Sequence, residues 1–171
     1  EQIASTYFAT YPNNIFLFLI LKVFYKVIFA ITGSTDIIYV VLLNAVVTFI
    51  AIIFMYLTAV KLWGSHIGLF TGITCLFFAP FYVYVAYYYT DTFSLPFIIP
   101  VYLYLCAVNS KKLIPKYILF ITAGILLTLG FKLKATVAIV LIAMIIHLFL
   151  SQKILTALKY TGVMVASCII I

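Results

Sequence analysis

The chain has 171 residues, of which 68% are hydrophobic and only 8% are charged. In soluble domains roughly a quarter of all residues are charged. This composition therefore excludes an ordinary soluble domain and indicates an integral membrane protein. The net charge of +7 comes from ten lysines against Glu1, Asp36 and Asp91. These lysines are scattered between apolar runs, which argues against nucleic-acid binding and favours a role in membrane orientation.

The first candidate element is "YPNNIFLFLILKVFYKVIFAITGS", residues 11–34, where a polar turn precedes an apolar run with two lysines near its middle. If this run crossed the bilayer, Lys22 and Lys26 would each cost about 2.5–3.5 kcal/mol at its centre. Because residues four apart share a helix face, the two lysines fit a juxtamembrane helix over 13–33 that lies in the outer interface. A spanning helix whose lysines face a polar cavity remains the alternative.

The rest of the chain, 37–171, predicts a transmembrane bundle, because a spanning helix needs about 20 apolar residues. The fold class is therefore an all-α, polytopic membrane protein with about six transmembrane helices, the last of them truncated. Since the sequence begins at Glu1 and its last apolar run is short, we expect residues 1–171 to be a fragment of a longer chain that forms a single domain. The expected spans are 37–60, 66–86, 92–108, 116–130, 136–150 and a last one from Tyr160.

Lysines recur in alternate loops, and short cytoplasmic loops are enriched in lysine, so these loops should face the cytoplasm. The opposite loops, 33–36, 86–91 and 131–135, should then face outward, and two of them hold the internal carboxylates. The lysines of the expected cytoplasmic loops are Lys61, Lys111, Lys112, Lys116, Lys153 and Lys159.

Asp91 is the strongest candidate for chemistry, because a carboxylate at the entrance of a span can bind a metal, position a hydroxyl nucleophile or accept its proton. The structural alternative is a helix N-cap, which suits the positive end of the helix dipole. For Asp36, directly before Ile37, the cap is the favoured interpretation.

The tyrosine-rich stretch "YVYVAYYYTDT", residues 82–92, leads into Asp91. Tyrosines gather at membrane boundaries, so an aromatic belt is the simplest interpretation of this stretch. Aromatic rings also form platforms for sugars, and that alternative stays open.

The segment "GFKLKAT", residues 130–136, places Lys132 and Lys134 in an outward loop, against the positive-inside rule. Lysine binds phosphate as a compact point charge, and the phosphate of a lipid carrier lies at this depth. Snorkelling of the two side chains is the alternative. Residues two apart do not share a helix face, so at most one of them should point at a site unless the turn is irregular.

The remaining polar candidates are weak. His66 and His147 have no second histidine or carboxylate at ligand spacing, so metal binding is not expected there. The three cysteines, Cys75, Cys106 and Cys168, lack paired spacing and predict core positions.

Three motifs in this order give the chain a family resemblance. "YPNN" at 11–14 is similar to a proline turn that begins an outer juxtamembrane helix. "YYTDTFSLPF" at 88–97 is similar to a segment with an outer-loop aspartate, and "GILLTLGFKLKAT" at 124–136 to a glycine-rich helix that ends in a lysine. Together they resemble the C-type membrane glycosyltransferases, which include protein O-mannosyltransferases and lipid A aminoarabinose transferases.

The resemblance implies inverting transfer of a sugar from a polyprenyl-phosphate donor to an extracytoplasmic glycan, lipid or protein acceptor at the cell membrane, with a bacterial plasma membrane favoured. It implies that Asp91 positions the acceptor, or a divalent metal ion if one is used, and that Lys134, with Lys132 beside it, binds the donor phosphate. The family's general-base acid precedes the proline turn, so a fragment without that acid is expected to be inactive. The expected lining of the cavity is Tyr11, Asn13, Asn14 and Tyr89.

Other classes of protein remain as alternatives. A membrane transporter or lipid flippase would also keep polar groups inside a helical bundle, but the spans hold few internal charges. A polysaccharide polymerase or ligase would be expected to have an arginine-rich outer loop, and the chain contains no arginine. A membrane scaffold is the third alternative.

Overall fold

The computed structural model describes residues 8–87 and 89–169, and every regular element within these ranges is a helix. This confirms the all-α membrane fold. The α-helices are α2 (Asn13–Thr32), α3 (Ile38–Trp63), α4 (Ser65–Phe77), α5 (Ala79–Val83), α6 (Thr90–Ser94), α7 (Ile99–Asn109), α8 (Leu113–Leu133), α9 (Ala138–Ser151) and α10 (Ile154–Ile169). Short 3₁₀ turns occur at η1 (Tyr84–Ala86), η2 (Leu95–Ile98) and η3 (Ala135–Val137).

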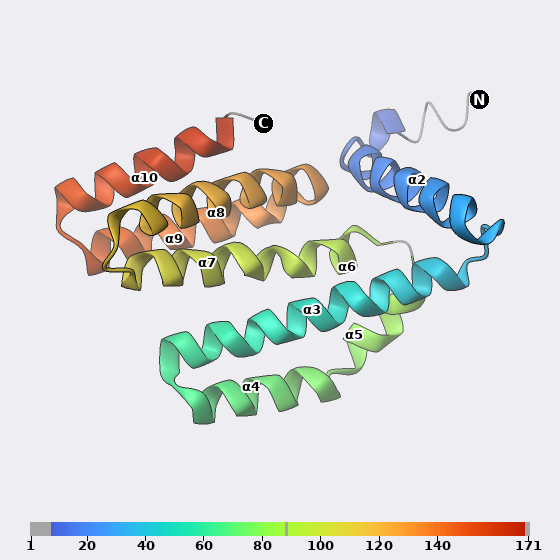
Figure 1. Ribbon diagram of the computed structural model, residues 1–171, viewed down its shortest axis with the longest axis horizontal. Coiled ribbons are helices and arrows are strands. Elements are labelled where there is room, and N and C mark those ends of the chain that lie inside the picture. The colour runs from blue at the N-terminus through green and yellow to red at the C-terminus, as the bar shows by residue number, and fades with distance from the viewer. Residues whose placement is uncertain (1–7, 88, 170–171) are drawn as a thin grey trace.

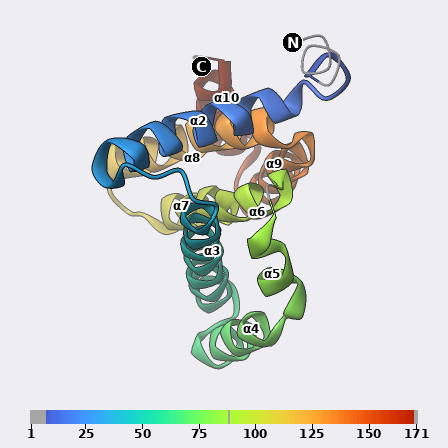
Figure 2. The ribbon, with the colours of Figure 1, turned by 90° about the vertical axis from the view of Figure 1, so that its right-hand side faces the viewer.

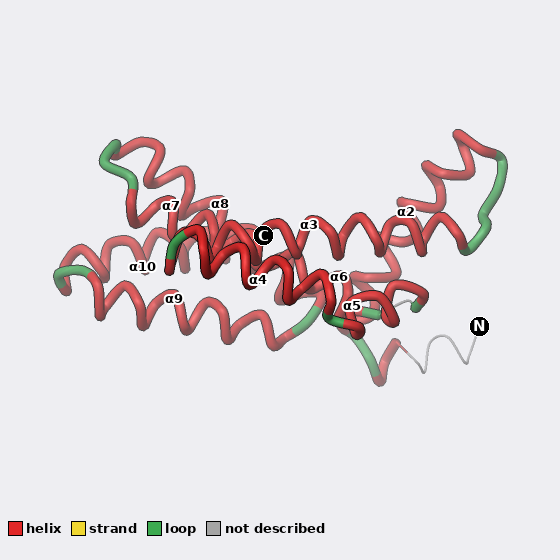
Figure 3. Tube along the Cα trace, turned by 90° about the horizontal axis from the view of Figure 1, so that it is seen from below, coloured by secondary structure: helices red, strands yellow, loops and turns green. Residues whose placement is uncertain are grey.

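The helices from α3 to α10 form an antiparallel bundle that runs back and forth along the long axis of the molecule (Figure 1). Short connections join them, so consecutive helices lie side by side, as the paired contacts of α3 with α4 and of α7 with α8 show. The helix α8 packs against both α7 and α10, and the view from below shows the same back-and-forth course (Figure 3). The bundle therefore has two ends, and the connections between its antiparallel helices lie at one or the other.

Four helices are long and apolar enough to cross a membrane, and α2 is one of them. A fifth span results if the bent pair Ser65–Phe77 and Ala79–Ala86 is taken as one. The apolar helices Ala135–Ser151 and Ile154–Ile169 are shorter. The expected count of about six is reached within the bundle only when the bent pair and both shorter helices are included.

The expected span over 66–86 is bent, because the chain turns by 50° between Phe77 and Ala79. The cause is Pro80, which has no N–H to donate to the carbonyl oxygen of Leu76 four residues earlier. The hydroxyl of Tyr82 donates to this oxygen instead, at 2.5 Å. The break therefore leaves no unpaired carbonyl at Leu76.

The last helix begins at Ile154, not at Tyr160, so Lys159 lies within a helix and not in a loop as expected. Its ammonium lies 5.5 Å from the ring centre of Tyr117 on α8, while the ammonium of Lys116 lies 5.3 Å from the ring centre of Tyr160. This reciprocal pair of cation–π contacts lets a lysine sit inside the helix, because its charge is stabilised by a ring on the neighbouring helix.

The main core lies between α7, α8, α9 and α10 and is built around large aromatic and sulfur-containing side chains. The rings of Phe120 and Tyr160 stack with centroids 4.7 Å apart. On the same side of α8, Gly124 lets α10 approach so closely that an added Cβ would lie 2.5 Å from the carbonyl oxygen of Met164. A small residue at the contact of two helices is typical of membrane bundles.

Helix α2 ends where it was expected to, because Gly33 adopts a left-handed conformation (φ 69°) and its N–H caps the carbonyl of Phe29 at 2.9 Å. Seen along the bundle, α2 runs crosswise over one end of it (Figure 2). A small cluster of Leu17, Phe93 and Leu133, with Phe16 packed against it, fastens α2 to α6 and α8.

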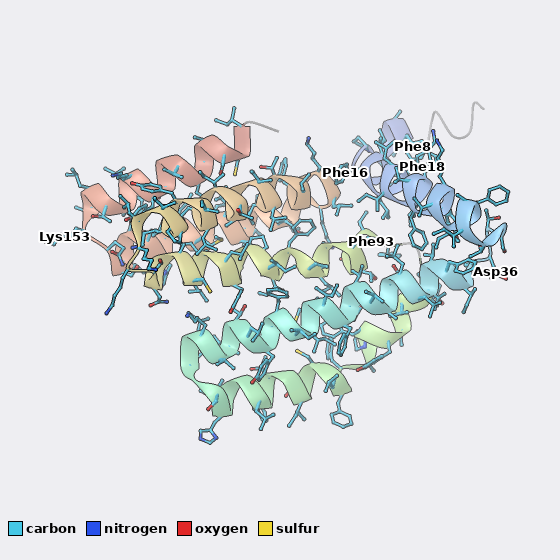
Figure 4. The ribbon with its side chains drawn as sticks, viewed as in Figure 1. Phe8, Phe16, Phe18, Asp36, Phe93 and Lys153 are labelled. Atoms are coloured by element: carbon cyan, nitrogen blue, oxygen red, sulfur yellow. The ribbon has the colours of Figure 1, made fainter. Side chains whose placement is uncertain are left out.

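The two ends of the bundle differ in charge, and Figure 4 shows Asp36 and Lys153 at opposite ends. The turns at Gly64, at 110–112 and at 152–153 make up the end of Lys153. The turns at 33–37, 84–90 and 134–137 make up the end of Asp36. Because short cytoplasmic loops are enriched in lysine, we infer that the end of Lys153 faces the cytoplasm.

This orientation predicts the outcome of cysteine labelling of the full-length protein after its native cysteines are replaced by alanine. Single cysteines at Thr35 and Tyr87 should react with a membrane-impermeant maleimide in intact cells. Single cysteines at Lys111 and Lys153 should react only after the membrane is permeabilised. Labelling of both sets from the same side would contradict the orientation.

The close contact of α8 with α10 predicts that Gly124→Leu destabilises the protein by about 1–3 kcal/mol, the usual range for overpacking. Thermal unfolding in detergent measures this effect. Gly162→Ala is the matched control, because an added Cβ at Gly162 on α10 meets no atom within 4 Å. An equal loss in both variants would contradict the packing argument.

Candidate active site

Asp91 and Lys134 form an ion pair at the end of the bundle where Asp36 lies, with Lys134 Nζ donating to Asp91 Oδ1. The two residues are 43 positions apart in the sequence and come from the start of α6 and the end of α8. The side chain of Lys134 is 29% exposed and that of Asp91 is 50% exposed, so both charges remain accessible to a ligand.

Asp91 reaches this position because the chain is extended at Tyr87 and Tyr89 and turns into α6 at Thr90. Asp91 lies in the first turn of α6 and makes no capping hydrogen bond, since the cap position is Tyr89. Its carboxylate is instead held by Lys134. Asp36 behaves differently: its Oδ1 accepts a hydrogen bond of 2.9 Å from the N–H of Ile38, which agrees with the capping interpretation.

Lys134 leaves the helical path of α8, because α8 ends at Leu133 and Lys134 is extended (φ −152°, ψ 118°). The N–H of Lys134 still donates to the carbonyl of Gly130 at 2.8 Å. Gly130 is buried against Phe97, and an added Cβ there would lie 2.6 Å from the Phe97 ring. This irregular turn directs Lys134 toward Asp91, while Lys132 remains on the exposed last turn of α8.

The segment before Asp91 is fixed by Asn44, a fully buried residue of α3. Its side-chain amide donates to the carbonyl oxygens of Val85 at 2.8 Å and Tyr87 at 3.0 Å. These carbonyls belong to the end of the η1 turn, where the helical hydrogen-bond pattern stops, so Asn44 supplies the donors that the backbone lacks. Sequence reasoning missed Asn44, because an asparagine inside an apolar helix does not reveal its partner.

A cavity of about 120 Å³ lies beside Asp91. Tyr84 forms part of its wall, and sequence reasoning did not select this tyrosine from the others in the stretch 82–89. The irregular turn at η1 is the reason, because no helical or strand period predicts which ring faces Asp91. The full lining is Pro80, Phe81, Tyr84, Asp91, Thr92 and Leu95.

Among the residues expected to line the cavity, those with described side chains are not part of its wall. The ring of Tyr89 packs against that of Tyr84, with centroids 5.7 Å apart. Tyr11 is exposed and Asn14 partly buried, and the N–H of Asn14 donates to the carbonyl of Tyr11 at 3.1 Å before α2. The side chain of Asn13 lies outside the described part of the structure.

The histidines lie away from this site. His66 is exposed at the start of α4, and Nδ1 of His147 is paired with the hydroxyl of the buried Tyr104 at 2.5 Å. Within the described residues, no three His, Cys, Asp or Glu side chains gather at one point. Asp91 alone, with an ammonium on its carboxylate, does not fit a metal ion.

Fold and site together define a multi-pass membrane protein with an accessible acid–lysine pair at one end of its helical bundle. Comparison of the sequence with family models identifies it further: the chain belongs to the dolichyl-phosphate-mannose-protein mannosyltransferase family, whose model matches residues 16–171. The protein is therefore of the glycosyltransferase type, as the motif resemblance indicated. No curated protein and no solved structure matches the chain significantly.

The Asn44 contacts predict that Asn44→Leu destabilises the protein by about 1–3 kcal/mol, because two part-buried carbonyls lose their donor. Amide hydrogen exchange should accelerate over residues 84–91. Thr48→Val is the matched control: Thr48 lies one turn further along α3, is 3% exposed, and its hydroxyl has no hydrogen-bond partner among the described residues. Unchanged amide exchange over 84–91 in Asn44→Leu would show that the Asn44 hydrogen bonds do not fix this segment.

Proposed function

We propose that the protein transfers a sugar from a polyprenyl-phosphate donor to a hydroxyl group of an extracytoplasmic acceptor, with inversion at the anomeric carbon. The observation that carries this proposal is the accessible Asp91–Lys134 pair at the end of the bundle opposite the lysine-rich turns. The name of the family supports the donor class, because dolichyl phosphate is a polyprenyl phosphate, and it names protein as the acceptor.

Lys134 is suited to the phosphate of the donor. As the bond between the anomeric carbon and the phosphate oxygen breaks, its electrons remain on that oxygen and negative charge grows on the departing lipid phosphate. A fixed ammonium at this point lowers the free energy of the transition state. Because Lys has three N–H donors, Lys134 can keep Asp91 as a partner while it binds the phosphate. Lys132, two residues earlier on the exposed last turn of α8, is a second cation of the same segment.

Asp91 is suited to positioning the acceptor. Lys134 holds Oδ1, and Oδ2 can accept a hydrogen bond from the acceptor hydroxyl. In the transfer step the hydroxyl oxygen forms a bond to the anomeric carbon, and its proton passes to a carboxylate that acts as general base. In this proposal Asp91 positions the acceptor hydroxyl. The general base that takes the proton is the acidic residue that the family resemblance implies before the proline turn.

Helix α2 supports a site at the outer interface. It crosses the end of the bundle at which Asp91 lies, and several of its apolar side chains away from the lysine face, such as Val23 and Val27, are exposed. Such a helix fits a position along the membrane surface, with its apolar side chains in the lipid. Lys22 and Lys26 are both exposed and share one face, so they can reach lipid headgroups or water.

The proposal is tested with the full-length protein and a radiolabelled polyprenyl-phosphate sugar. Asp91→Asn and Lys134→Ala should each lower the transfer rate at least about tenfold, the rate equivalent of 1.4 kcal/mol. Both variants should remain folded, because a solvent-accessible ion pair contributes only about 0–1 kcal/mol.

The double variant Asp91→Lys with Lys134→Asp separates this role from a structural one. It restores an ion pair between the same two positions but reverses the charges that the substrates meet. We expect transfer to remain lost. If the double variant transferred sugar at the wild-type rate, the pair would have a structural role only, and the proposed site would be wrong.

A further inference from the structure

We propose that the ring of Tyr84, supported by Tyr89, is a binding surface for the sugar ring of the donor. This inference rests on the proposed function and adds to it the residue that holds the sugar. The carrying observation is that Tyr84 and Asp91 are walls of one cavity of about 120 Å³.

The location follows from the chemistry of the donor. In a polyprenyl-phosphate sugar, the anomeric carbon is attached directly to the phosphate, so the sugar ring must lie next to the cation that binds the phosphate. Lys134 contacts Asp91, and Asp91 lines the cavity with Tyr84. A phosphate on Lys134 therefore places its sugar at this cavity.

Tyr84 is held in place, unlike a tyrosine that only anchors a helix at the interface. Its ring packs against the ring of Tyr89 at 5.7 Å with an interplanar angle of 45°. The backbone that follows it is clamped by Asn44 through the carbonyls of Val85 and Tyr87. The exposed fraction of Tyr84 is 47%, so part of its side chain remains open to a ligand.

The other tyrosines of the stretch have different surroundings. The Tyr82 hydroxyl satisfies the Leu76 carbonyl at the helix break, and Tyr87 is 55% exposed and does not line the cavity. Within the described residues, the Tyr84 hydroxyl makes no hydrogen bond that would direct its ring elsewhere. Among the tyrosines of this stretch that the structure describes, Tyr84 is thus the one that lines the cavity beside Asp91.

The two walls together suit a sugar ring. One face of a pyranose ring presents C–H groups with partial positive charge, which are attracted to the negative face of an aromatic ring. The sugar hydroxyls can donate hydrogen bonds to the Asp91 carboxylate. The two walls therefore offer one apolar and one polar contact to the same sugar ring.

The test compares the binding of two lipids to the full-length protein in lipid nanodiscs: polyprenyl-phosphate hexose and polyprenyl phosphate without a sugar. Tyr84→Ala should weaken binding of the sugar-bearing lipid by about three- to tenfold, as expected for the loss of one aromatic contact. Binding of the bare lipid phosphate should not change. Tyr84→Phe should retain most of the affinity for the sugar-bearing lipid, because it keeps the ring.

Tyr87→Ala is the matched control, because it removes a ring of the same turn that does not line the cavity. Equal weakening of both lipids by Tyr84→Ala, or the same loss in Tyr87→Ala, would overturn the subsite. A change confined to the KM of the acceptor would overturn it as well. Failure of the wild-type protein to transfer the hexose from the lipid would instead overturn the proposed function, so the two failures are distinguishable.

Discussion

The structure depends on one constraint: in an apolar surrounding, every backbone N–H and C=O must find a partner within the protein. This constraint keeps the described chain helical, and where the helical pattern is interrupted it requires another partner for the backbone groups. At the break before Pro80, the pairing is restored by a side chain, the Tyr82 hydroxyl. At the end of η1, the Asn44 amide has the same role. Polar chemistry is therefore possible where helices begin and end, and the candidate site lies at such a place.

The ion pair of Asp91 and Lys134 joins two helix ends that are distant in sequence. Its accessibility means that it contributes little to stability, yet the backbone around it is shaped by several specific features. Lys134 is extended, Gly130 admits the ring of Phe97, and Asn44 fixes the approach to Asp91. This local organisation around a weak ion pair is expected if the pair binds a substrate. The membership in a mannosyltransferase family supports that role.

The tyrosine-rich stretch illustrates how one composition serves several purposes. Tyr82 repairs a broken helix, Tyr84 borders the cavity beside Asp91, and Tyr89 packs behind Tyr84. A simple aromatic belt would not distinguish these side chains, because all of them lie near the same membrane boundary. Their differences arise from the bend at Phe78 and the η1 turn, which direct neighbouring rings to different partners.

The sequence by itself determined the membrane class, the helical fold, most helix positions and the end of the bundle at which Asp91 and Lys134 lie, because hydropathy and lysine placement depend on local composition. It also determined the capping role of Asp36, a contact between near neighbours in the chain. Only the tertiary structure decided that Lys134 meets Asp91, that Asn44 clamps the turn and that Tyr84 borders the cavity. These contacts join segments that are far apart along the chain or depend on irregular backbone, and no sequence period encodes either.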